Sequence, residues 1–161
     1  EAGSVLSGNG NTSADPEVLV AIGGLSANMG SANITEIEFV TTSFDKSDGG
    51  NIDVLVRFNE PVTVTGTPRV SITNGNQGSG SGRGPHLANF LSGSTTNELT
   101  FRCTIAAANS ATNAGDILVI GANALALNSG TIKDTGQSGT NATITSSAGI
   151  GTAAGSITVA A

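Results

Sequence analysis

Aromatic side chains are scarce in this chain, which has no Trp, no Tyr and five Phe among its 161 residues. Pockets that bind small ligands are lined largely by apolar and aromatic side chains, so this scarcity counts against carbohydrate recognition. A chain of this length is most simply one domain with a sizeable core. That core must be built mainly from Val, Ile, Leu and Ala.

Cysteine occurs once, at Cys103, so no disulfide can form within the chain. Cys103 falls in phase with Leu99, Phe101 and Ile105, and this spacing predicts a small, buried apolar side chain. A catalytic thiol would need a neighbouring His or a helix N-terminus, and the sequence indicates neither.

Charged residues make up 11% of the chain and leave a net charge of −6, with a pI of about 4.4. The six Lys and Arg residues are scattered and form no basic stripe, which disfavours nucleic acid and anionic membranes as partners. No apolar run approaches the ~20 residues that a membrane-spanning helix requires. We therefore expect no membrane insertion.

Histidine also occurs once, at His86. A Ser–His–Asp triad would need this residue, but no Gly-x-Ser-x-Gly elbow is present, and we expect His86 in a loop or an interface. Glu36 and Glu38 are two apart on an expected strand, so they share its outward face and are interpreted as solvated surface. The sequence predicts no catalytic residues and a protein that is not an enzyme.

Gly, Ser, Thr and Asn are abundant, and between them apolar residues recur at every second position, most clearly from Ile52 to Phe58. This period is typical of half-buried strands. Pro61 is expected to form a corner between two strands. The expected strands are 34–39, 52–58, 62–64, 70–72, 87–91, 99–105, 117–120, short pieces within 125–132, 142–144 and 157–159. The sequence predicts an all-β fold, an antiparallel β-sandwich of about seven to nine strands.

Three segments are predicted along the chain: an N-terminal arm (1–33), the β-sandwich (34–145), and a C-terminal arm or added strand (146–161). The arms are Gly-, Ser- and Thr-rich. The first residue is Glu1, and an initiator Met is normally retained before so bulky a residue. We therefore expect upstream sequence, and a signal peptide stays compatible with the chain.

Three blocks carry a resemblance to a known family: NIDVLVRFNEPVTVTGTP (51–68), ANFLSGSTTNELTFR (88–102) and ALALNSGTIKD (124–134). Their ordered succession resembles the Ig-like repeat of large bacterial surface and adhesin-type proteins and of marine phage structural proteins. The resemblance implies an Ig-like sandwich over about 34–145. It implies little about function, because such modules serve as spacers, adhesive units and decorations alike.

Asp45, Asp48 and Asp53 surround a Gly-rich turn, and oxygen ligands on such a turn are what calcium requires. An EF-hand loop that began at Asp45 would place Val56 where the bidentate Glu belongs. The segment therefore reads as a polar hairpin turn, with a calcium site as the alternative. Asp116 and Asp134 are further candidates for a site at the end of the sandwich.

We hypothesise a non-enzymatic structural subunit of a large assembly, in which the terminal arms contact other copies or a major capsid or fibre protein. The leading form is a capsid decoration or accessory protein on the surface of a phage virion. The alternatives are a secreted bacterial surface fibre or adhesin subunit, and a calcium- or carbohydrate-binding module. An arm with an apolar segment can add a strand to a neighbour's sheet edge. The predicted assembly contacts are Val18, Leu19, Val20, Ile22 and Arg83.

Overall fold

The computed structural model describes residues 30–74, 84–108, 112–137, 139–150 and 155–161. These residues contain ten strands and no helix, and thus no helix able to cross a membrane, which confirms the all-β prediction. The strands are β1 (Ile34–Phe39), β2 (Phe44–Asp45), β3 (Gly50–Thr65), β4 (Arg69–Asn74), β5 (His86–Ser92), β6 (Thr96–Ile105), β7 (Ile117–Val119), β8 (Leu125–Ala126), β9 (Thr131–Asp134) and β10 (Ser156–Ala160).

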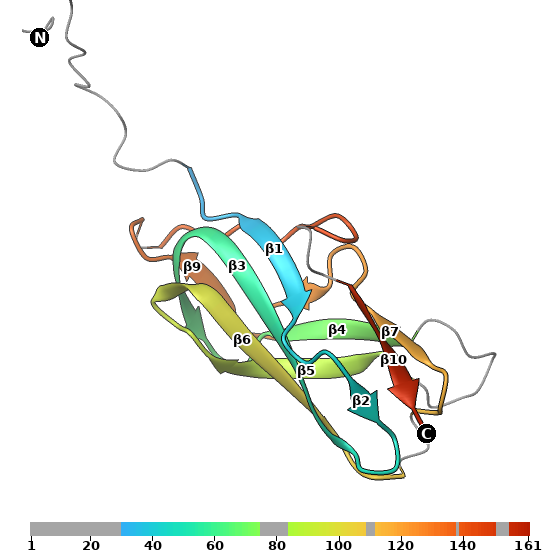
Figure 1. Ribbon diagram of the computed structural model, residues 1–161. Coiled ribbons are helices and arrows are strands. Elements are labelled where there is room, and N and C mark those ends of the chain that lie inside the picture. The colour runs from blue at the N-terminus through green and yellow to red at the C-terminus, as the bar shows by residue number, and fades with distance from the viewer. Residues whose placement is uncertain (1–29, 75–83, 109–111, 138, 151–154) are drawn as a thin grey trace, which may run out of the picture.

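The strands form one curled, mixed sheet in the order β1-β3-β6-β5-β4-β7-β10-β2, with β8 beside β4 and β9 beside β3 (Figure 1). Neighbouring strands are antiparallel except β2 and β10, which are parallel. β4 pairs with β5 through Arg69–Ile72 and with β7 through Thr73 and Asn74. Because β4 joins both halves of the sheet, the strands make a half-barrel in place of the two separate antiparallel sheets that the sequence predicted.

The core fills the concave side of this sheet. Ile52, Val54, Val56 and Phe58 alternate inward along β3, as their period-two spacing predicts, and all four are buried. Phe101 of β6 is also fully buried. Each large apolar side chain that is fully buried in this way contributes about 1.5–3 kcal/mol to stability. The long β3 strand therefore supplies one continuous wall of the core.

The predicted corner at Pro61 is wrong, because β3 continues through it as one strand. The register shifts between Arg57 and Val62, and the outer partner of β3 changes there from β1 to β9. Proline cannot donate to a sheet ladder, so an interruption of the pairing is a place where a strand tolerates it. The carbonyl of Pro61 still accepts a hydrogen bond of 3.0 Å from the Thr135 amide.

The predicted strand at 142–144 is also wrong. Residues 139–150 are irregular apart from isolated bridges, but they cover the outer edges of β1 and β9. The amide of Ala142 donates to Ile132 (3.0 Å), that of Thr143 to Ala32 (2.7 Å), and Ile37 donates to the carbonyl of Ile150 (3.3 Å). These bonds satisfy edge groups that would otherwise invite pairing with another chain.

The last predicted strand is present as β10, whose Ile157 and Val159 are buried. It lies between β7 and β2 within the sheet. Residues 30–33 and the C-terminus lie at opposite ends of the molecule (Figure 1). A partner bound at residues 30–33 would therefore lie far from one bound at the C-terminus.

Candidate functional site

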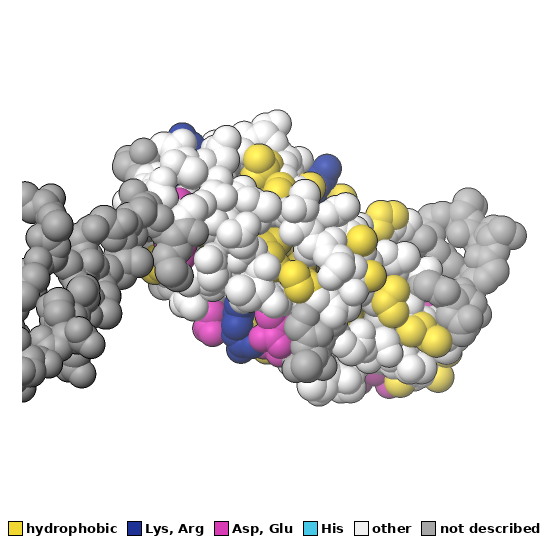
Figure 2. Space-filling view, turned by 90° about the horizontal axis from the view of Figure 1, so that it is seen from above, with side chains coloured by type: hydrophobic (Ala, Val, Ile, Leu, Met, Phe, Trp, Pro, Cys, Tyr) yellow, Lys and Arg dark blue, Asp and Glu magenta, His cyan; other side chains and the backbone are white. Residues whose placement is uncertain are grey.

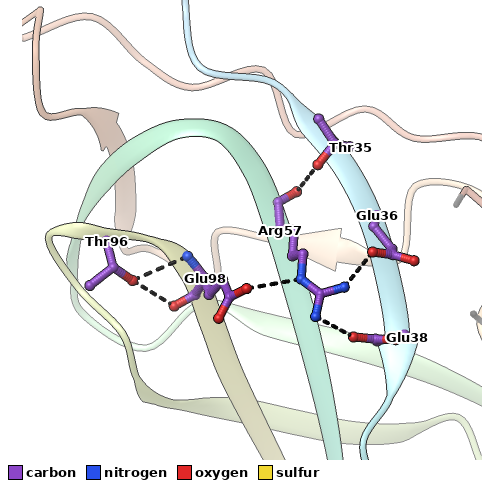
Figure 3. Close-up of polar contacts among 6 residues, drawn as sticks. All are labelled: Thr35, Glu36, Glu38, Arg57, Thr96 and Glu98. Carbon is purple, nitrogen blue, oxygen red and sulfur yellow. Dashed lines mark hydrogen bonds and ion pairs between the residues drawn. The ribbon is translucent and has the colours of Figure 1, made fainter.

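The outward face of β1, β3 and β6 carries a charged cluster around Arg57. Three carboxylates from the strands on both sides converge on its guanidinium (Figure 3). Arg57 Nη2 lies 2.9 Å from Glu38 Oε1 and Nε lies 3.0 Å from Glu98 Oε1, while Nη1 pairs with Glu36. The hydrogen bonds to Glu98 and Glu36 raise the pKa of Arg57. One cation and three anions leave the cluster with an excess of negative charge.

A second ion pair lies on the same face. Arg102 of β6 donates from Nε and Nη2 to the two carboxylate oxygens of Asp53 of β3, both at 2.7 Å. This two-pronged geometry is the strong form of an Arg–carboxylate pair. The hydrogen bond from Arg102 lowers the pKa of Asp53.

Seen from above, a group of Lys, Arg, Asp and Glu side chains lies together at one edge of the molecule, and a few more are scattered over a face that is otherwise largely uncharged in its described part (Figure 2). The outward face also exposes Leu87 and Leu91 of β5, which are 39% and 48% accessible. Asn89 lies between them and is opposite Arg102 in the β5–β6 pairing.

The structure does not bring the three calcium candidates together. Asp45 Oδ1 accepts hydrogen bonds from the Ser47 amide (2.8 Å) and hydroxyl (2.6 Å), and these bonds lower the pKa of Asp45. Asp48 is exposed in the following turn, and Asp53 is paired with Arg102. Within the described ranges, no three His, Cys, Asp or Glu side chains are grouped to hold a metal ion, and this includes Asp116 and Asp134.

A buried polar cluster, of which the sequence indicated only Asp116 as a candidate site residue, lies where β4, β5 and the residue before β7 meet. Asp116 is fully buried, and its Oδ2 accepts hydrogen bonds from Asn74 Nδ2 (2.7 Å) and the Asn113 amide (2.8 Å). His86 is opposite Ile72 in the β4–β5 pairing, two residues along β4 from Asn74, and the Asp116 charge acts to raise the pKa of His86. Of the two positions expected for His86, the loop is wrong, because this residue begins β5 and is buried, and the interface stays a prediction.

A shallow hollow of about 480 Å³ lies beside this cluster, and Asn113 belongs to both. Lys46 Nζ donates to Asn113 Oδ1 across 3.0 Å. The lining residues are Lys46, Ser47, Ala108, Asn113, Ala114 and Ala161. The described lining residues bring one cation and small side chains together, and none of them has a carboxylate or imidazole side chain.

The predicted assembly contacts Val18, Leu19, Val20, Ile22 and Arg83 lie outside the described residues. Comparisons of this chain with protein-family models, with curated proteins and with solved structures find no match. Its function is therefore inferred from its residues and from the geometry of the described part.

Proposed function

We propose that this protein is a non-enzymatic structural subunit of a large assembly, in the leading case a decoration or accessory protein on the surface of a phage virion. The observation that carries the proposal is the way residues 30–33 are fixed at one end of the half-barrel. Gln137 Nε2 donates to the Gly30 carbonyl (3.0 Å), and the hydroxyls of Ser31 and Thr143 share a hydrogen bond of 3.0 Å. The Asn33 amide donates to Asn59 Oδ1 at 2.6 Å.

These bonds give the chain a fixed exit toward residues 1–29, at the end opposite the C-terminus (Figure 1). A subunit held through its N-terminal segment would therefore present its opposite end away from the attachment point. The apolar stretch 18–22 is the part of that segment best suited to bury surface against a partner. The covered edges of β1 and β9 favour attachment through this segment over direct pairing of sheets at those edges.

The order of the strands supports an Ig-like module. In constant-type Ig domains, strands A, B, E and D form one sheet and C, F and G the other. Along this sheet, β1-β3-β6-β5 have the neighbour order A-B-E-D, and β4-β7-β10 have the order C-F-G. The difference is that β4 and β5 remain hydrogen-bonded, which joins the two groups. The long connection between β7 and β10 holds β8, β9 and the edge-covering residues 139–150.

The proposal is tested by tagging this protein and asking whether it attaches to the virus particles released by the culture that produces it. We expect the full chain to band with the particles in a density gradient, and a variant without residues 1–29 to stay at the top. The matched control for this truncation is a full-length variant in which Val18, Leu19, Val20 and Ile22 are all changed to Ser. It keeps the length of the N-terminal segment and removes only its apolar side chains. Both variants should keep the thermal melting of the full chain. Absence of the full chain from every particle fraction would refute the virion proposal.

A secreted surface fibre or adhesin subunit is the second candidate, favoured by the position of residues 30–33 and the C-terminus at opposite ends. Modules with ends so placed can be joined in a line. Cell-surface labelling with an antibody to the chain, together with a signal peptide in its gene, would favour the fibre. A capsid gene beside the gene of this chain would favour the virion.

A further inference from the structure

The buried cluster around Asp116 connects three separate parts of the sheet. Its carboxylate binds Asn74, the last residue of β4, and the backbone of Asn113 in the connection before β7. Its own carbonyl accepts a hydrogen bond of 2.9 Å from the Val159 amide of β10. The β4, β7 and β10 end of the half-barrel is therefore held together at one fully buried residue, through its carboxylate and its backbone carbonyl.

His86 begins β5 beside this connection, opposite Ile72 of β4 and thus two residues along β4 from Asn74. The residue is 7% exposed, and its Nε2 is buried without a hydrogen-bond partner among the described residues. Thr112 Oγ1 is in the same condition. Burial lowers the pKa of His86, and the smaller effect of the Asp116 charge opposes this. Of the described charged groups, Asp116 is the one whose charge bears on the pKa of His86, and it raises that pKa. Lys46, the nearest cation named in this cluster, donates its hydrogen bond to the side chain of Asn113.

We propose that His86 and Asp116 form a proton-operated latch at this end of the half-barrel. When His86 is protonated, its ring becomes a buried cation that competes with Asn74 and Asn113 for the Asp116 carboxylate. The hydrogen bonds that join β4 to the connection before β7 then weaken, and this end opens locally. The latch does not depend on the proposed virion role, because it concerns the folded chain alone.

The direction of the pH effect follows from linkage. His86 titrates near 6.5 in the unfolded chain and at a lower pH in the folded chain, where burial favours the neutral ring. The contribution of neutral His86 to the stability of this end is therefore complete above about pH 6.5. It is lost as the pH falls from there toward the pKa of His86 in the folded chain. Linkage to one proton limits the change in the opening equilibrium to about tenfold per pH unit.

The test uses the full chain and two measurements. Because His86 is the single histidine, its ring resonances in an NMR titration are unambiguous. Amide hydrogen exchange, corrected for intrinsic rates, is compared between about pH 7.5 and about pH 5.5. We expect a histidine pKa below 6.5 and a loss of protection of up to about tenfold per pH unit at the amides of Asn113 and Val159. The amide of Val54 in β3 should keep its protection.

His86→Gln should abolish this acid-induced loss, because glutamine does not titrate. Asp53→Asn is the matched control: it removes an acid-sensitive pair on the outward face of β3 and should leave the loss at Asn113 and Val159 intact. A histidine pKa at or above 6.5, or an equal loss of protection in β3, would overturn the proposal. These two outcomes are read from the unmodified chain, so they decide the question even where His86→Gln does not fold.

Discussion

Replacing Phe101 by alanine should remove one of the largest contributions to the stability of the half-barrel. Phe101 is fully buried in the middle of β6, opposite Val54 of β3 and Phe90 of β5. Truncation of a buried Phe typically costs about 3–5 kcal/mol. Its ring meets that of Phe90 edge to face, with centroids 5.8 Å apart and planes at 70°. Such pairs add about 0.5–1.5 kcal/mol beyond the area that they bury.

The assay is urea unfolding followed by far-UV circular dichroism, because a chain without Trp or Tyr offers little intrinsic fluorescence. Phe101→Ala and Phe90→Ala, alone and together, form a double-mutant cycle. We expect a coupling free energy of about 0.5–1.5 kcal/mol. Leu99→Ala with Phe90→Ala is the matched control, since Leu99 is equally buried on β6 and should show coupling below about 0.5 kcal/mol. A cost for Phe101→Ala below about 2 kcal/mol, or coupling no larger than in the control, would refute the reasoning.

Two further predictions concern single positions. Gly93→Ala should lower the free energy of unfolding by more than about 1 kcal/mol, because φ is +106° and a Cβ there would overlap the carbonyl oxygen of Glu98. Gly139→Ala, at φ +98° in open space, should cost less in the same urea titration, and an equal cost would show that the overlap is relieved elsewhere. Cys103 should react slowly with a thiol reagent in the native protein and rapidly in urea, because the thiol is buried and burial raises its pKa. Rapid labelling of the native protein would contradict this placement.

The inward faces of the strands could be predicted from sequence because their signal is local. The alternation from Ile52 to Phe58 shows which side of β3 is buried, with no knowledge of its partners. The same alternation wrongly predicted a strand at Ala142 and Ile144, although both side chains do pack on the core. Their backbone makes scattered edge bonds in place of a ladder, and apolar spacing does not distinguish the two. The corner predicted at Pro61 is wrong because a register shift allows β3 to exchange partners there without ending.

The polar clusters depend on contacts that are distant in sequence. The shared outward face of Glu36 and Glu38 was predicted and is confirmed, since both lie on the outer side of β1 beside Arg57. Their convergence on Arg57 requires the register of β1, β3 and β6, which no short pattern reveals. The approach of His86 to Asp116 likewise depends on the way β4 joins β5 and β7. When polar residues stand alone in Gly-rich segments, the sequence gives no indication that they will contact one another in the folded chain.

The parallel pairing of β2 with β10 has a mechanical consequence. Residues 30–33 and the C-terminus lie at opposite ends (Figure 1), so a pull between them runs along the strands and not across them. The hydrogen bonds that hold β10 to β2 and β7 then carry the load together in shear, whereas a hairpin pulled open at one end loses its bonds one at a time. We expect the half-barrel to resist tension between these two ends best along this axis.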